Sequence, residues 1–294
     1  MKFFFRFLTL LILVLSGRAE AGSLSESDFE NLGRSIGAIG DTKAFCSAFL
    51  VHPQILIGIS HCNHNMIVRT VRFKTGTEQS SYKIRRIFEI GQDGVALYYI
   101  DKPVLDRPLL KLSRLAQGIQ FPMIAMGYPS NWPNENGVKI PLPESDLGLR
   151  ASWSKGHSVT ELKDGISKAC KGHKLTLANG SPVHTNATIL VADQPYVSGS
   201  GMSGAPVFDR TGAVVGIHTC EGGGFYSSQE ALETLTTMKE ALGQGLSPQR
   251  VITVPGKGRG YPAMRLAMDG SLGVYYAPDY LTADLLDFIL SNAD

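Results

Sequence analysis

The segment Gly199-Ser-Gly-Met-Ser-Gly-Ala-Pro-Val207 decides the fold of this chain. It places Gly199, Gly201 and Gly204 around Ser203. Glycine tolerates positive φ and lets another molecule approach the main chain, so a serine in this setting is a candidate exposed nucleophile. The amide N–H groups of Gly201 and Ser203 are candidates for stabilising negative charge on a reacting oxygen. A serine in a glycine-rich loop is more often a turn former. Other residues of the chain are therefore needed to distinguish a nucleophile from a turn residue.

Short apolar runs, separated by turn residues, extend from this segment in both directions. Many of them are rich in β-branched residues or alternate in polarity. This pattern is typical of an antiparallel sandwich or barrel and predicts an all-β fold. The runs include Phe45–Val51, Gln54–Ile59, Met66–Phe73, Tyr82–Glu89, Val95–Ile100, Phe121–Tyr128, Thr188–Val191, Pro206–Phe208 and Ala213–Thr219.

Helical periodicity appears late in the chain. Apolar residues at helical spacing predict a helix over Ser228–Leu242, which Gly243 ends. Thr282 can cap a second helix at the C-terminus. The apolar residues of this second helix are Leu285, Leu286, Phe288 and Ile289.

The stretch Pro129–Pro143, rich in proline and asparagine, shows no periodicity and predicts a long surface loop. It separates an N-terminal half, about residues 35–128, from a C-terminal half, about residues 145–294. A chain of 294 residues is long enough for one large all-β domain or for two small lobes around a cleft.

The first 21 residues have the features of a signal peptide. Lys2 and Arg6 precede an apolar run, and Ala19-Glu-Ala21 has the small-x-small pattern of a signal-peptidase site. We therefore expect a secreted or periplasmic protein, with an uncleaved anchor as the alternative. Without this segment Lys+Arg falls from 28 to 25 and Asp+Glu from 26 to 25, so the formal net charge is 0. A neutral chain without a long basic run offers no electrostatic reason to expect a nucleic-acid partner.

Four cysteines remain after residue 21, namely Cys46, Cys62, Cys170 and Cys220. An even number in an exported chain favours disulfides, and the spacing leaves three pairings open. The same count argues against a zinc site at Cys46, Cys62 and the neighbouring histidines. We expect no metal ion and no organic cofactor.

A serine nucleophile needs a base, usually a histidine that a carboxylate orients. His61 directly follows an apolar run and precedes Cys62. Asp93 lies at a glycine-flanked turn before the run Val95–Ile100. Each residue alone is more often structural. Their joint occurrence, in the order His61, Asp93, Ser203, favours a catalytic set.

These motifs resemble those of the chymotrypsin-like (trypsin superfamily) serine proteases. The family's histidine segment is similar to Ile59-Ser-His-Cys62, its aspartate segment to Asp93-Gly-Val-Ala-Leu97, and its serine segment to Gly201-Met-Ser-Gly-Ala-Pro206. Gly273-Val-Tyr-Tyr276, followed by a helix, resembles the end of the family's domain. The resemblance spans about residues 35–294. It implies two six-stranded antiparallel β-barrels with the active site between them.

The resemblance also implies a role for each residue. His61 is general base and then general acid, Asp93 orients its imidazolium, and Ser203 is the nucleophile. Gly201 and Ser203 supply the oxyanion hole. Cys46–Cys62 matches the disulfide beside the family's catalytic histidine, which leaves Cys170–Cys220 as a second pair.

Met202 departs from the family's pattern. Digestive members carry an aspartate there, which pairs with a newly cut N-terminus and orders the site. Methionine cannot form that ion pair, so Arg34-Ser-Ile-Gly37, although it resembles an activation site, is not expected to be one. We interpret Arg34 as a surface charge. Bacterial branches of the family also lack this aspartate.

Substrate preference is expected to depend on Ser198, His218 and Thr219. Ser198 and Gly216-Ile-His218 resemble the bacterial glutamyl endopeptidases, in which a hydroxyl and an imidazole can bind a substrate carboxylate. This implies a preference for acidic residues at P1, against which the nearby Glu221 argues. His218 as a buried core histidine is the alternative.

An insert, about residues 222–270, lies between His218–Glu221, the expected wall of the specificity pocket, and the strand at Gly273-Val-Tyr-Tyr276. It either caps the cleft or decorates the surface.

Two further patterns are set aside. The glycines of 199–204 also fit G-x-G-x-x-G, but a strand-like segment rather than a helix follows them. Ala205 breaks the G-x-S-x-G pattern of α/β-hydrolases.

The sequence therefore predicts a secreted serine endopeptidase that acts on protein or peptide substrates through an acyl-enzyme. After removal of the signal segment we expect no membrane association. The alternative is a protease-like binding protein that keeps the fold without turnover. Hydrolysis of esters but not of peptides is a third hypothesis.

Overall fold

The computed structural model describes residues 25–40, 45–59, 61–65, 70–75, 78–90, 95–114, 120–142, 148–159, 189–192, 197–220, 224–229, 231–232, 235–236, 239, 253–254, 263–266 and 283–293. Several predictions fall outside these residues. They are the signal segment 1–21, Asp93, Cys170, Glu221, the strand at Gly273-Val-Tyr-Tyr276 and the cap at Thr282.

The N-terminal half forms a closed ring of six antiparallel strands in the order β5-β4-β1-β2-β3-β6, because β5 and β6 also pair. The strand bounds are β1 Ile36–Gly40, β2 Phe45–His52, β3 Ile55–Ile59, β4 Thr70–Thr75, β5 Glu78–Ile90 and β6 Val95–Ile100. Its interior is filled by large branched and aromatic side chains. Among those that are completely buried are Ile36, Ile39, Phe49, Leu56, Phe73 and Leu97.

The C-terminal half forms a closed six-stranded barrel in the order β10-β11-β14-β13-β12-β7. The bounds are β7 Gln120–Gly127, β10 Arg150–Val159, β11 Ile189–Ala192, β12 Pro206–Phe208, β13 Val214–Cys220 and β14 Gly224–Ser227. The fold is thus the predicted all-β double barrel. The division between the halves falls between β6 and β7, earlier than residue 128, because β7 pairs with β10 and β12.

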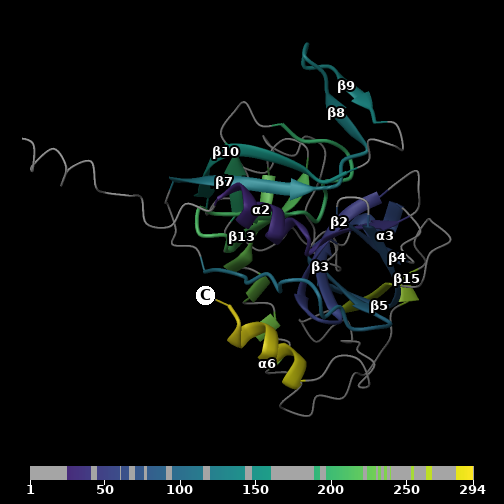
Figure 1. The fold of residues 1–294 in the computed structure, drawn as a ribbon. Coiled ribbons are helices and arrows are strands. Elements are labelled where there is room, and N and C mark those ends of the chain that lie inside the picture. Colours follow the sequence, from purple (N-terminus) through teal and green to yellow (C-terminus); the bar gives the residue numbers. More distant parts are fainter. Residues whose placement is uncertain are drawn as a thin grey trace, which may run out of the picture.

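The predicted loop Pro129–Pro143 contains a two-stranded hairpin of β8 (Asn131–Pro133) and β9 (Lys139–Pro141). In Figure 1 this hairpin projects away from the barrels. The surface-loop prediction is correct about exposure, since residues 134–141 are exposed, but it missed the pairing. Proline-rich segments accommodate such pairing when the prolines lie at strand edges.

Helix α2 (Glu26–Gly33) lies between the two halves and was not predicted (Figure 1). Ser25 caps it, because its Oγ accepts from the Asp28 N–H while the Asp28 carboxylate accepts from the Ser25 N–H. These hydrogen bonds lower the pKa of Asp28. The helix contacts the C-terminal barrel, where the Phe29 ring meets the edge of Trp153 at a centroid distance of 5.4 Å.

The predicted C-terminal helix is present as α6 (Ala283–Ser291), and residues in the predicted helix Ser228–Leu242 that the structure describes are helical. Leu286 and Ile289 are buried in the core, and Phe288 packs edge-on against His52 of β2 at 5.0 Å. Asp287 pairs with Lys239. The C-terminal helix is therefore bound to both the N-terminal barrel and the late helical segment.

Part of the predicted insert belongs to the N-terminal sheet. Strand β15 (Thr253–Val254) pairs with β16 (Ala263–Leu266), which runs parallel to the end of β5 at Phe88–Ile90. The insert is thus more than a surface decoration at this point. Among the described residues, no helix has both the length and the apolar character needed to cross a membrane.

Candidate active site

His61 begins α3 (His61–Asn65), which follows β3 after one residue. The chain there is fixed by a disulfide between Cys46 of β2 and Cys62, with a Cα–Cα distance of 6.2 Å. Cys62 is completely buried, whereas His61 is half-buried. The predicted Cys46–Cys62 pair is therefore confirmed, and it holds the segment that carries His61. The Cys170–Cys220 pair lies outside the described residues because Cys170 does.

Ser203 lies beside this segment although it belongs to the other barrel. Its carbonyl oxygen accepts a hydrogen bond of 2.8 Å from the N–H of Ser47 in β2. The same oxygen is 4.0 Å from Sγ of Cys62, the residue next to His61. Cys62 and Ser203, which are 141 residues apart in the sequence, thus lie close together at the boundary between the barrels.

Two successive turns shape the loop around Ser203. The N–H of Met202 donates to the carbonyl of Gly199 at 3.1 Å, and the N–H of Ala205 donates to the carbonyl of Met202 at 2.8 Å. Gly201 and Gly204 occupy the third position of these turns, with φ values of 101° and 84°. A positive φ at that position is the mark of a type II turn and favours glycine. The glycine pattern of the sequence is thereby explained.

The turns also set the direction of the Ser203 amide. In a trans peptide the carbonyl and the N–H point in opposite directions. The Met202 carbonyl is held by the Ala205 N–H at 2.8 Å, so the Ser203 N–H points away from Ala205. Ser203 itself is neither fully buried nor freely exposed.

Gly204 fits where another residue would not. A Cβ there would collide with the Ser47 carbonyl oxygen and lie 3.1 Å from both the Gly58 Cα and the Ile59 N. The loop therefore packs directly on the backbone of β2 and β3. Backbone hydrogen bonds with His218 complete the attachment, since Gly204 N–H donates to its carbonyl at 2.7 Å.

The side chain of Ser47 connects three segments at this site, which the sequence did not reveal. Its Oγ donates to the Gly201 carbonyl and accepts from the Tyr128 N–H, both at 2.9 Å, and the residue is completely buried. It therefore connects β2, the loop around Ser203 and the end of β7. A lone serine after Cys46 carries no signal for this role in the sequence.

Met202 lies in the core of the C-terminal barrel. It is completely buried with Met123, Ala125, Ala205 and Val207. An apolar side chain suits this environment, because an unpaired charge there would lose its hydration.

Arg34 is more tightly bound than a surface charge. Its guanidinium donates to the Asp106 carbonyl at 2.7 Å, and its own carbonyl accepts from Arg107 at 2.6 Å. Ser35 and Ile36, which follow it, are completely buried. The backbone that follows Arg34 is thus packed into the core.

Asp93 lies outside the described residues, but the strands on either side of this site are described. Ile59, two positions before His61, pairs with Val95, two positions after Asp93. The Tyr98 hydroxyl of β6 donates to the Ile59 carbonyl at 3.2 Å. The last residue of β3, before His61, and the first residue of β6, after Asp93, therefore lie side by side at the same end of the two strands.

The predicted specificity residues are buried. Ser198, His218 and Thr219 are 2%, 1% and 3% exposed. The His218 ring packs edge-on against Phe225 at 5.4 Å. His218 is therefore a core residue of the C-terminal barrel in this structure.

The side chains of Cys46, His61 and Cys62 come close enough together to suggest a metal site. The two sulfur atoms are bonded to each other, so they are not available as thiolate ligands. This leaves one imidazole, which is too few ligands for a structural zinc site.

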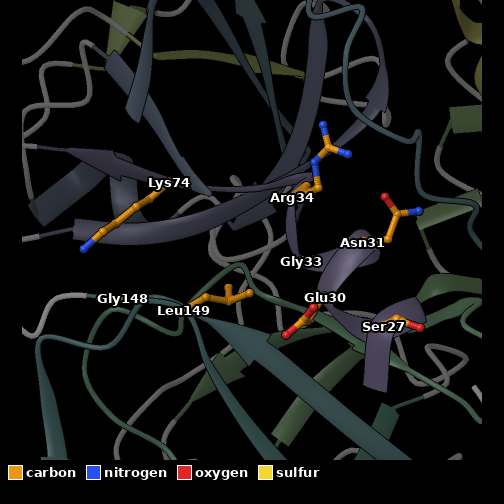
Figure 2. Close-up of a pocket in the computed structure, with 8 residues that line it drawn as sticks. All are labelled: Ser27, Glu30, Asn31, Gly33, Arg34, Lys74, Gly148 and Leu149. Carbon is orange, nitrogen blue, oxygen red and sulfur yellow. The ribbon is translucent and has the colours of Figure 1, made fainter. Parts of the chain in front are cut away.

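An open pocket of about 660 Å³ lies elsewhere, between α2, Lys74 at the end of β4, and Leu149. Figure 2 shows that Glu30 is directed toward Leu149, whereas Lys74 and Arg34 extend away from it. Binding sites usually combine an apolar lining with polar groups that converge. Neither His61 nor Ser203 lines this pocket, so it is separate from the candidate active site.

Solved structures with similar folds include proteases and protease-like proteins. An inactive form of Rv3671c from M. tuberculosis, a serine-to-alanine mutant, has 15% identity and a TM-score of 0.45, and the match covers 74% of this chain and 95% of that one. An inactivated protease paralogue of the scabies mite has 14% identity and a TM-score of 0.48, with 74% and 96% covered. The HtrA-type protease AlgW, solved with a tripeptide, has 14% identity and a TM-score of 0.47, with 76% and 65% covered.

No curated protein sequence matches the chain significantly. The family of the trypsin-like peptidase domain matches residues 46–217, which is more than half of the chain. This range includes both the segment of His61 and the loop of Ser203. The chain therefore belongs to the trypsin-like peptidase family.

Proposed function

We propose that the chain is an exported serine endopeptidase with His61, Asp93 and Ser203 as its catalytic triad. The observation that carries the proposal is the meeting of two barrels at Ser203, whose carbonyl lies 4.0 Å from Cys62 and is bound by Ser47. Membership of the trypsin-like peptidase family supports peptide-bond hydrolysis as the reaction.

In the proposed reaction, the Ser203 Oγ attacks the carbonyl carbon of the scissile peptide while His61 takes its proton. The resulting tetrahedral intermediate collapses as the C–N bond breaks, and His61 gives the proton to the leaving amine. Water, deprotonated by His61, then attacks the acyl carbon. The bond to Ser203 Oγ breaks, His61 returns the proton to Oγ, and the carboxylic acid product leaves. Asp93 keeps the imidazole oriented and stabilises its positive charge. The pairing of Ile59 with Val95 supports this role.

The N–H groups of Gly201 and Ser203 form the oxyanion hole in this proposal. Support comes from the two type II turns, which leave both amides on the loop that carries the nucleophile. Donors fixed before the reaction stabilise the transition state without reorganisation. Protein or peptide substrates follow from the family.

We further propose export through the segment 1–21 and a preference for acidic P1 residues. The second proposal is supported by residue type, because Ser198, His218 and Thr219 offer hydroxyl and imidazole donors. Their burial means that a substrate carboxylate has to enter a dry site. Such a site rejects substrates whose P1 side chain leaves its hydrogen-bond donors unpaired.

Peptide cleavage by the chain beginning at Gly22 tests the proposal. The wild type, His61→Ala and Ser203→Ala are compared on a peptide library and on an ester substrate. We expect a pre-steady-state burst and peptide cleavage by the wild type alone, with acidic P1 residues enriched among the cleavage sites. Folded wild type that cleaves only esters, or nothing, contradicts the endopeptidase proposal and favours a protease-like binding protein.

A further inference from the structure

We propose, building on the proposed function, that Ser130 and Asn131 are positioning residues for the oxyanion hole. Ser130 binds the carbonyl of the peptide between Ser200 and Gly201, and Asn131 binds the N–H of the peptide before it. Together they fix Ser200 so that the Gly201 N–H stays available to the substrate. We call these two residues the Ser130–Asn131 clamp.

The clamp binds Ser200 on both sides of its backbone. The Ser200 N–H donates to Asn131 Oδ1 at 2.9 Å. The Ser200 carbonyl accepts from the Ser130 N–H at 2.6 Å and from the Ser130 Oγ at 3.0 Å. Asn131 Nδ2 also donates to Ser200 Oγ at 3.2 Å. Four hydrogen bonds on one residue leave its two peptide planes little freedom to rotate.

The consequence for catalysis follows from peptide geometry. The Ser200 carbonyl and the Gly201 N–H belong to one trans peptide and point in opposite directions. With the carbonyl bound to Ser130, the Gly201 N–H is directed away from the clamp. Rotation of this peptide plane would remove the donor and bring a carbonyl oxygen in its place, which would repel an oxyanion.

Gly201 makes this control necessary. Its φ is 101°, and glycine opposes rotation of neighbouring peptide planes less than any other residue. Met202, the next residue, is buried among apolar side chains and offers no charged group to an ion pair. The loop is therefore ordered by hydrogen bonds from outside, through the clamp on one side and Ser47 Oγ on the other.

The hairpin β8–β9 gives the clamp a fixed base. Asn131 is the first residue of β8, and the Leu142 N–H donates to the Ser130 carbonyl at 2.9 Å. A Cβ on Gly199 would collide with the Asn131 carbonyl oxygen and lie 2.8 Å from Pro129 Cβ, so the loop and the hairpin base are in direct contact.

Asn131→Ala tests the proposal with Asn134→Ala as its matched control. Asn134 lies in the same hairpin, and its Oδ1 accepts from the N–H groups of Asn136 and Val138 at 3.0 Å, remote from Ser200. Loss of one oxyanion donor lowers kcat by about 10²–10³, so a donor that is only misaligned is expected to cost about 10–100-fold. We expect this loss in kcat with KM nearly unchanged for Asn131→Ala, a smaller loss for Ser130→Ala, and wild-type kcat for Asn134→Ala.

Hydrogen exchange at single residues gives a second readout that does not depend on activity. The Ser200 amide is expected to lose protection in Asn131→Ala, while the His218 amide, bound to the Ala205 carbonyl, keeps it. An active Asn131→Ala enzyme with unchanged kcat, or an equal loss in Asn134→Ala, overturns the proposal. If the wild type is inactive, the proposed function fails instead, and unchanged Ser200 exchange in Asn131→Ala still refutes the clamp.

Discussion

The two barrels hold the segments of His61 and Ser203, which we propose to be catalytic, by different physical means. On the N-terminal side, His61 follows a strand buried among large aliphatic and aromatic side chains, and a disulfide fixes the next residue. On the C-terminal side, Ser203 lies on a loop with glycines at positive φ, small neighbours and hydrogen bonds to the other barrel. The comparison shows that a buried strand and a disulfide together can hold the short helix that carries a side chain. The loop of Ser203, whose amides we propose to bind the oxyanion, is held instead by close backbone contact and by hydrogen bonds from polar groups.

The largest expected effect tests whether the two sides act as one unit. His61→Ala and Ser203→Ala are each expected to lower kcat by about 10⁴–10⁶. The double variant is expected to lose no more than the worse single one, because neither residue works without the other. Steady-state kinetics on a cleaved peptide measures this. Losses that multiply in the double variant would mean that His61 and Ser203 act independently.

The second prediction concerns the close contact at Gly204. Gly204→Ala is expected to destabilise the fold by more than about 3 kcal/mol, since backbone strain of about 1–2 kcal/mol adds to the collision with Ser47. Gly137→Ala is the matched control, because φ there is 74° but open space surrounds the site. Gly137→Ala is expected to lower the free energy of unfolding only by the backbone strain. Urea unfolding distinguishes the two, and similar costs at both sites would contradict the close packing.

The third prediction concerns the disulfide on the N-terminal side. Replacing Cys46 and Cys62 together with alanine is expected to lower the free energy of unfolding by about 2–4 kcal/mol, for a sequence separation of 16. Thermal unfolding under oxidising conditions measures the loss. A double variant that keeps wild-type stability and kcat would show that packing alone positions His61.

The smallest expected effect concerns His52, which packs on the C-terminal helix. Burial lowers the pKa of His52 below that of the unfolded chain. The unfolded chain therefore binds the extra proton more readily, so stability is highest above pH 6.5 and falls as the pH drops through and below that value. His52→Phe is expected to flatten this dependence between pH 7 and pH 5, with the ring contact to Phe288 kept. If the free energy of unfolding depended on pH equally in the wild type and the variant, this role of His52 would be contradicted.

The sequence predicted most of the strands with long apolar runs, but it missed the short strands β1 and β14, although these bury Ile36, Ile39, Phe225 and Tyr226. It also missed β10. Its buried position at Ser152 is polar and small, while its large Trp153 is 62% exposed and covered in part by Phe29. The alternation of apolar and polar residues is therefore inverted, and only the pairing with β7 reveals the strand. Helix α2 has a capping signal at Ser25 and Asp28, but eight residues give little periodicity.

At the site, the sequence identified the residue types that chemistry requires and could not identify those that position them. His61 and Ser203 could be proposed from the sequence because their motifs are local. Ser47 and the Ser130–Asn131 clamp were missed because their role depends on partners far away in the chain. The acidic P1 preference, the triad role of Asp93 and the export remain predictions.

Labelling with a fluorophosphonate probe tests the central claim most directly. The chain beginning at Gly22 is compared with Ser203→Ala and His61→Ala, and the labelled residue is mapped by mass spectrometry. We predict one modified serine, Ser203, in the wild type alone. Folded, disulfide-bonded wild type that is not labelled, or is labelled at another serine, would contradict an activated nucleophile at the boundary of the two barrels.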